Sequence, residues 1–150
     1  MTTAWWDNIW LNEGFATWME QKATNHFYPE WNFETRTGIA NSRIMDMDAR
    51  KTTHPIQQPV KNPTDAISSF DGITYTKGAA FLRMLEAFVG EKPFRDGIRA
   101  YIEGHLYSNA TTADLSQGDC QLDQLKNEIR VHFLTSLVRE RHWPDPKDFC

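Results

Sequence analysis

The stretch from residue 5 to residue 28 constrains the fold most, because it is long, rich in aromatic residues and free of proline. At 100° per residue its apolar side chains cover every side of a helix from about Trp6 to about His26, and Pro29 ends that helix. A helix that is apolar all round is typical of a buried position. We therefore predict a core helix here, whose apolar residues are Trp5, Trp6, Ile9, Trp10, Leu11, Phe15, Trp18, Met19 and Phe27.

Helical periodicity continues along the rest of the chain and predicts a mainly α fold. The helices are expected at about 33–48, at about 73–89, from about Pro93 onward and at 121–141, with a capping box at Thr111–Asp114 opening a further one. Segment 49–69 carries three prolines and is predicted to be an extended loop. No convincing alternating pattern of a strand is present.

Composition excludes several classes of function. The chain has 16 basic and 20 acidic residues in 150, a net charge of −4, which argues against a nucleic-acid surface. No apolar run has the length of a membrane span. Cys120 and Cys150 are too few for a disulfide scaffold or a thiolate metal site, and they leave the redox compartment open.

Glu13 is the first residue with a chemical signal, since a carboxylate inside an aromatic helix is costly to bury without a partner. Either it faces a local opening or pairs with an arginine of a later helix, or it is a ligand for a metal or substrate. Glu20 lies two turns along the same face. It is either a carboxylate that supports such a site or an ordinary solvated side chain.

The run WWDNIWLNEGFA, from Trp5 to Ala16, strongly resembles the zinc aminopeptidases of the aminopeptidase N type. That family includes the puromycin-sensitive aminopeptidases and leukotriene hydrolase, and its members carry WLNEGFA on a helix. The resemblance implies that Glu13 is the third protein ligand of a catalytic zinc. The activity it implies is hydrolysis of N-terminal residues from peptides.

A second run, FDGITYTKGAA from Phe70 to Ala80, resembles the Tyr-x-Lys-Gly-Ala signature of the same family. The resemblance implies that the Tyr75 hydroxyl points at the scissile carbonyl and stabilises the oxyanion, a role suited to a phenol donor. His54-Pro55-Ile56, Asn109-Ala110 and Asp114-Leu115 fit the family pattern in order. The implied fold is the helical lobe of a thermolysin-like metallopeptidase domain, incomplete on its N-terminal side.

The resemblance also implies a His-Glu-x-x-His helix ahead of Glu13, with two zinc ligands and the general base. That motif occurs nowhere in the chain, and its position would fall before Met1. None of the five histidines (His26, His54, His105, His132 and His142) takes it, and the family's Gly-x-Met-Glu-Asn motif is absent too. A catalytic zinc needs three protein ligands. We therefore expect this chain alone to bind zinc weakly or not at all, and to be inactive.

The resemblance ends near residue 115, so we predict a partial catalytic domain over 1–115 and a divergent amphipathic helix with an irregular tail over 116–150. The apolar stripe of 121–141 packs on the preceding helices or meets another molecule. Glu128 and His132 share a helix face there, a spacing more typical of a surface pair than of a metal site. His105 is expected to interact with the carboxyl end of its own helix.

Two functions from different classes stay open. The chain is a fragment of a zinc metalloaminopeptidase with a peptide substrate, or it is a non-catalytic helical interaction module or truncated remnant. Tryptophan surface left uncovered by a missing lobe would favour self-association.

Overall fold

The computed structural model describes residues 1–117, so the predictions for residues 118–150 lie outside the described part, among them Cys120, the 121–141 helix, the Glu128 and His132 pair and Cys150. The larger helices are α1 (Trp10–Phe27), α2 (Phe33–Asp48), α4 (Gly78–Val89) and α5 (Glu91–Gly104). The shorter elements are β1 (Thr2–Thr3), η1 (Trp6–Asn8), η2 (Pro29–Trp31), α3 (Pro63–Ser68), η3 (Ile73–Lys77), β2 (Asn109–Ala110) and α6 (Thr112–Gln117). The described part is mainly helical, as the periodicity predicts.

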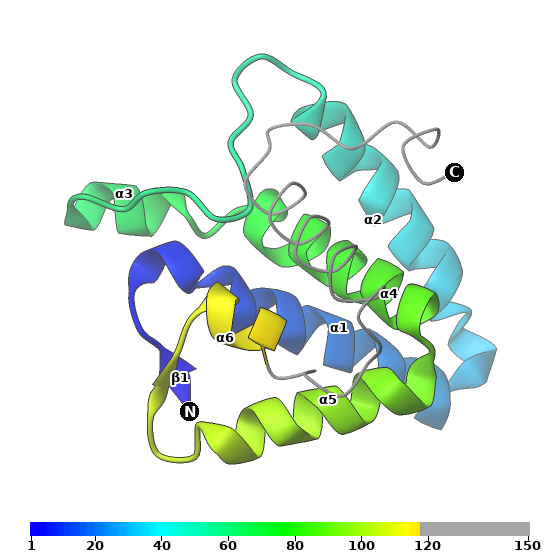
Figure 1. Cartoon of the computed structure of the whole chain (residues 1–150). Coiled ribbons are helices and arrows are strands. Elements are labelled where there is room, and N and C mark those ends of the chain that lie inside the picture. Colours follow the sequence, from blue (N-terminus) through cyan, green and yellow to red (C-terminus); the bar gives the residue numbers. More distant parts are fainter. Residues whose placement is uncertain (118–150) are drawn as a thin grey trace.

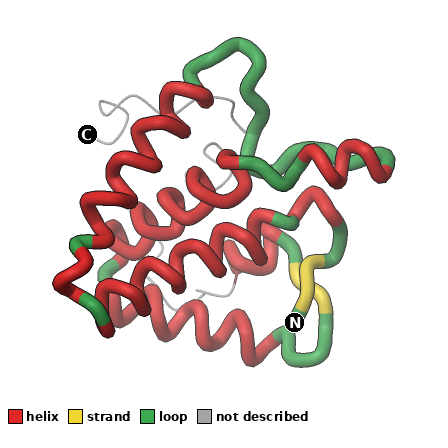
Figure 2. Tube along the Cα trace, turned by 180° about the vertical axis from the view of Figure 1, so that it is seen from behind, coloured by secondary structure: helices red, strands yellow, loops and turns green. Residues whose placement is uncertain are grey.

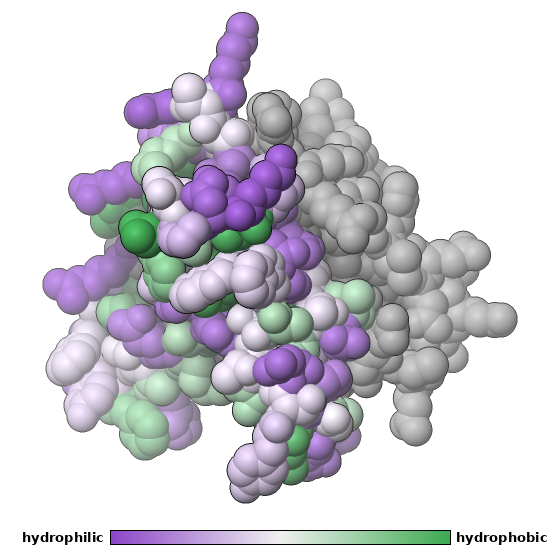
Figure 3. All heavy atoms as spheres, turned by 90° about the vertical axis from the view of Figure 1, so that its left-hand side faces the viewer, coloured by the Kyte–Doolittle hydropathy of each residue, from purple (hydrophilic) through white to green (hydrophobic). Residues whose placement is uncertain are grey.

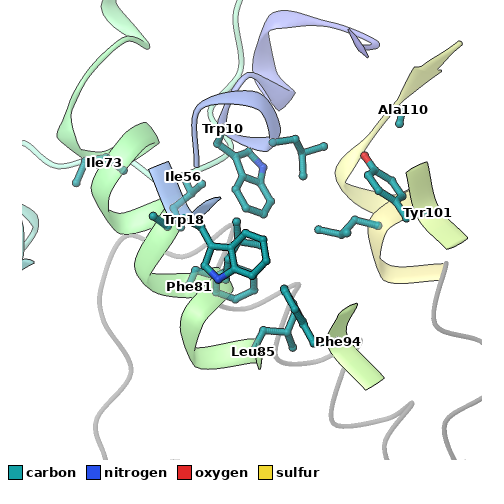
Figure 4. Close-up of a cluster of buried hydrophobic side chains, with 13 residues drawn as sticks. Trp10, Trp18, Ile56, Ile73, Phe81, Leu85, Phe94, Tyr101 and Ala110 are labelled. Carbon is teal, nitrogen blue, oxygen red and sulfur yellow. The ribbon is translucent and has the colours of Figure 1, made fainter. Parts of the chain in front are cut away.

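Helices α1 and α4 lie against each other in the middle of the molecule, with α2 on one side of the pair and α5 on the other (Figures 1 and 2). Their facing side chains form the core shown in Figure 4. Trp10 meets Phe81 edge to face with ring centroids 5.8 Å apart, and Trp18 meets Phe94 in the same way at 5.4 Å. Such aromatic pairs add to the free energy of burial.

The prediction that the first helix is buried on all sides is wrong. In α1 one face is buried, formed by Trp10, Leu11, Gly14 and Trp18, while Met19 and Phe27 are exposed. Trp5 and Trp6 precede α1 and are also exposed. The reason is geometric, because α4 and η3 cover one face of α1 and Trp18 meets Phe94 of α5, whereas the positions of Met19 and Phe27 stay exposed among the described residues.

The proline-rich segment 49–69 contains the short helix α3, which we did not expect. The Asn62 side chain accepts a hydrogen bond from the Asp65 main-chain N–H at 3.0 Å, and Pro63 occupies the first helical position. Both are favourable start signals for a helix. The proline that suggested a loop therefore begins a helix instead.

Other boundaries follow the sequence closely. Helix α2 has the predicted bounds, and Gly90 takes a positive φ of 95° between α4 and α5, a conformation that glycine adopts without strain. Helix α5 begins at Glu91, two residues before Pro93. Pro93 fits because N–H groups in the first turn have no partner within a helix.

The amino end of the chain is tied to the start of α6. Strands β1 and β2 pair in parallel, which places Thr2 opposite Asn109 and brings residues far apart in sequence together. The predicted capping box forms, since Thr111 N–H donates to Asp114 Oδ2 at 2.8 Å and Asp114 N–H faces Thr111 Oγ1 at 3.4 Å. Within residues 1–117 no helix is long and apolar enough to cross a membrane.

Candidate active site

Two glycines let α1 and α4 approach each other closely at one point. A Cβ atom placed on Gly14 would lie 3.2 Å from the carbonyl carbon of Gly78, and one on Gly78 would lie 3.4 Å from the Cα atom of Gly14. Any larger residue at Gly14 would therefore press on main chain rather than on a flexible side chain. Because of this contact, the residue before Gly14 and the turn before Gly78 are neighbours.

That turn, η3, is a π-helical turn that leads directly into α4. Its Ile73 and Thr74 side chains are buried, whereas Tyr75 is partly exposed. The Tyr75 main-chain N–H donates to the carbonyl oxygen of Asp71 at 3.1 Å. Single π-turns often occur at functional sites, because they displace a side chain from its regular helical position.

Glu13 and Tyr75 come together across the contact between α1 and η3. The Tyr75 hydroxyl lies close enough to the Glu13 carboxylate for the carboxylate to affect its pKa, and Glu13 is itself only partly buried. Burial, and after it the interaction with the Glu13 carboxylate, raise the pKa of Tyr75 above its ordinary value of 10.0. The phenol therefore keeps its proton at neutral pH and is a hydrogen-bond donor.

The structure separates Glu20 from this pair. Glu20 is exposed further along α1, and it makes no hydrogen bond or ion pair with the rest of residues 1–117. Among the same residues Glu13 has no ion pair with an arginine, so its contact with Tyr75 takes the place of the arginine pairing considered from the sequence. The roles of Glu13, Tyr75 and Glu20 stay predictions.

Sequence reasoning missed a buried ion pair behind the site. Lys77 Nζ lies 2.7 Å from Asp48 Oδ2, with the two side chains 2% and 0% exposed. Asp48 Oδ1 also accepts a hydrogen bond from the Thr53 hydroxyl at 2.7 Å. The pair joins the end of η3 to the end of α2. The only sequence signal was a lysine directly before the apolar start of α4.

A second missed pair holds the beginning of η3. His54 Nε2 lies 2.6 Å from Asp71 Oδ2, while Asp71 Oδ1 accepts the main-chain N–H groups of Ile73 at 2.9 Å and Thr74 at 3.1 Å. The sequence signal was His54-Pro55-Ile56, which fitted a pattern without suggesting a role. Both ends of the turn that carries Tyr75 are thus anchored by charged side chains.

The described residues do not by themselves fit a zinc ion. No group of three or more His, Cys, Asp or Glu side chains within residues 1–117 is placed to hold a metal. Glu13 offers one carboxylate, whereas a catalytic zinc requires three protein ligands. A cavity of about 470 Å³ lies elsewhere, between α1, α2 and α4, and neither Glu13 nor Tyr75 lines it.

His105 behaves as the sequence predicts. It follows the last residue of α5, and its Nδ1 donates to the carbonyl oxygen of Tyr101 at 2.8 Å. This contact satisfies a carbonyl group at the helix end and leaves no indication of a metal role.

Comparison with known proteins identifies the family. The "Peptidase family M1 domain" matches residues 1–132. The leucyl aminopeptidase of Saccharolobus solfataricus is 46% identical over 116 residues, which cover 77% of this chain and 15% of that protein. Aminopeptidase M1-D of Oryza sativa subsp. japonica is 35% identical over 144 residues, covering 96% of this chain and 16% of that protein.

Aminopeptidase M1 of Arabidopsis thaliana is 40% identical over 115 residues, covering 77% of this chain and 13% of that protein. The chain thus spans only about a seventh of the length of these relatives. The family match continues past residue 115, and the boundary placed there from the sequence stays a prediction. With a family match over residues 1–132, this chain belongs to peptidase family M1.

Proposed function

We propose that this chain is part of the catalytic domain of a zinc-dependent aminopeptidase, which removes N-terminal residues from peptides. The contact between Glu13 and Tyr75 carries the proposal. It places a carboxylate and a protonated phenol side by side, on two segments that each match a signature of the family. The names of the relatives, all aminopeptidases, support the same reaction class.

In this proposal Tyr75 acts on the peptide carbonyl. A phenol that keeps its proton donates a hydrogen bond to the carbonyl oxygen, and that bond strengthens as negative charge develops on the oxygen. Glu13 offers its carboxylate as one ligand of a zinc ion, and the His-Glu-x-x-His motif that the family uses for the other two ligands does not occur in the sequence. We therefore propose that the isolated chain has no peptidase activity.

The inactivity of the isolated chain has a direct test. The purified 150-residue chain is incubated with an aminoacyl p-nitroanilide, with and without added zinc, and release of p-nitroaniline is followed. We expect release at the rate of the buffer blank. Zinc-dependent release by the chain, abolished by a chelator, would contradict the proposal.

The roles of Glu13 and Tyr75 need a complete domain. The matching segment of the Saccharolobus solfataricus leucyl aminopeptidase, 46% identical to this chain, is replaced by the segment of this chain. In that chimera Tyr75→Phe should lower kcat about 100- to 1,000-fold with little change in KM, since the hydroxyl acts in the transition state. Glu13→Gln should lower both zinc content and activity.

Glu103→Gln, at an exposed position on α5, is the matched control and should leave kcat unchanged. An active chimera in which Tyr75→Phe keeps full kcat would exclude the oxyanion role of Tyr75. An active chimera in which Glu13→Gln keeps its zinc would exclude the ligand role of Glu13.

A further inference from the structure

His54 makes two contacts that fix its protonation state. Its Nδ1 lies 2.8 Å from the Pro55 carbonyl oxygen and its Nε2 lies 2.6 Å from Asp71 Oδ2. A carbonyl oxygen and a carboxylate oxygen both accept hydrogen bonds and neither donates. Each ring nitrogen must therefore carry a proton, so this geometry requires His54 to be an imidazolium cation. A neutral imidazole could keep only one of the two hydrogen bonds.

The charges around His54 favour that cation on balance. The hydrogen bond to Asp71 raises the pKa of His54 above 6.5, against a smaller opposing effect of burial, and Lys77 lowers it slightly. Lys77 is in turn paired with Asp48. The Asp71 carboxyl has a lowered pKa, since its contacts with His54 and with the N–H groups of η3 outweigh the effect of burial.

Asp71 links His54 to the turn that carries Tyr75 through hydrogen bonds. One carboxylate oxygen of Asp71 contacts His54, the other accepts the N–H groups of Ile73 and Thr74, and its main-chain carbonyl accepts the N–H of Tyr75. A single residue thus holds three consecutive residues of the π-turn. Because His54 lies in the loop between α2 and α3, it fixes the orientation of Asp71 from outside the turn.

We propose that His54 and Asp71 are positioning residues for Tyr75, and that the cationic form of His54 holds the turn in the arrangement that aims the Tyr75 hydroxyl at Glu13. The expected effect on catalysis rests on the proposed function. The positioning of Tyr75 by His54 and Asp71 does not. Loss of one His54 proton breaks one of its two hydrogen bonds, to the Pro55 carbonyl or to Asp71, and removes the positive charge that attracts the Asp71 carboxylate. Tyr75 then samples more orientations, while the Lys77–Asp48 pair still anchors the other end of the turn.

The geometric part is tested in the 150-residue chain itself. The chain is labelled with 13C at the tyrosine ζ-carbon and at the histidine ε1-carbon, and Tyr75→Phe identifies the Tyr75 signal. Between about pH 5.5 and 8.5 the Tyr75 signal should shift with the same midpoint as the His54 signal, well below the ordinary tyrosine pKa of about 10. In His54→Gln, which keeps a donor for Asp71 but cannot titrate, this shift should be lost.

His26→Gln, at an exposed position at the end of α1, is the matched control and should leave the shift of Tyr75 in place. The proposal is overturned if the Tyr75 chemical shift does not change at the His54 midpoint, or if it changes with pH in the same way in wild type and in His54→Gln. Circular dichroism identifies any variant that does not fold, and for such a variant the same labels are read in the chimera described above.

The catalytic consequence is measured separately in the chimera. His54→Gln should lower kcat by up to about 100-fold, the scale expected for a misplaced catalytic group, with little change in KM. It should also remove the part of the kcat pH profile that follows the His54 midpoint. Unchanged kcat and an unchanged profile overturn the catalytic consequence. An inactive chimera in which Tyr75 still follows His54 contradicts the proposed function and leaves the positioning role supported.

Discussion

Lys77 and Asp48 bury opposite charges almost completely behind the turn that carries Tyr75. Removing two charges from water is costly, and their mutual attraction repays that cost only while both are present. The pair therefore specifies how the end of η3 packs on the end of α2, and it adds little to the free energy of folding. Its effect on stability should become visible when one partner is removed.

Asp48→Ala should destabilise the chain by about 3–5 kcal/mol, because it leaves the lysine buried without its counter-charge. Urea denaturation followed by tryptophan fluorescence measures this loss. The control is the double variant Asp48→Leu with Lys77→Met, which replaces the pair by apolar side chains and should regain most of the stability. Equal losses in the single and the double variant would show that the charges are not coupled.

His54 should make folding stability depend on pH in a defined direction. Its pKa is raised in the folded chain, so its contribution is fully present below the unfolded value of 6.5 and is lost as pH rises through the folded value. Wild type should therefore be more stable than His54→Gln at about pH 6, and the difference should shrink at higher pH. Urea midpoints across this range measure it, and a difference that grows with pH would contradict the assignment.

At the scale of single residues, the sequence identified Glu13 and Tyr75 as candidate site residues, but it did not identify the side chains that hold the turn of Tyr75 in place. The two residues stand in long runs with rare tryptophans, which are specific. Lys77 and Asp48, or His54 and Asp71, become partners only through the path of the loop between α2 and η3. Periodicity carries no information on that path, so these pairs could not be predicted.

At the scale of elements, the close approach of α1 and α4 depends on small residues. Gly14 and Gly78 each leave room for the main chain opposite. The sequence predicts both helices, and α2 has the expected bounds. The π-turn was not predicted, because helical periodicity does not distinguish a π-helical turn from the start of an α-helix, and the proline at the first position of α3 suggested a loop.

Gly14→Ala should destabilise the chain by about 1–3 kcal/mol, since the added methyl group presses on the main chain of Gly78 and Ala79. Gly38→Ala is the matched control, because a Cβ there meets nothing within 4 Å and sits inside α2. That control should gain about 0.5–1 kcal/mol from helix propensity. Thermal and urea unfolding of both variants decide, and a Gly14→Ala chain as stable as wild type would exclude the close contact.

At the scale of the whole molecule, the helices of the described residues pack around one hydrophobic core that contains Trp10, Trp18 and Phe81. Apolar and polar side chains are interspersed on the face shown in Figure 3. Trp5 and Trp6 are 59% and 43% exposed, and Phe70, which contacts Trp6 edge to face, is 46% exposed.

These exposed rings lead us to expect self-association of the isolated chain. Sedimentation velocity should show an average mass that rises with concentration, and Trp6→Ser with Phe70→Ser should reduce that rise. Ile102→Ser, an exposed apolar position on α5, is the control and should have a smaller effect. A chain that stays monomeric at every concentration would contradict this expectation.

The family and the mainly α fold were both predicted correctly, the first from two motifs and the second from periodicity. The proposed function depends on Glu13 and Tyr75 lying in one site. A nuclear Overhauser measurement on the 150-residue chain tests this most directly, with Tyr75→Phe to assign its ring protons and the fully exposed Tyr107 as the control ring. We predict a cross-peak between the Tyr75 ring and the Glu13 side-chain methylene protons, and none from Tyr107. A folded chain in which the Tyr75 ring shows contacts to other residues and none to Glu13 would contradict the account.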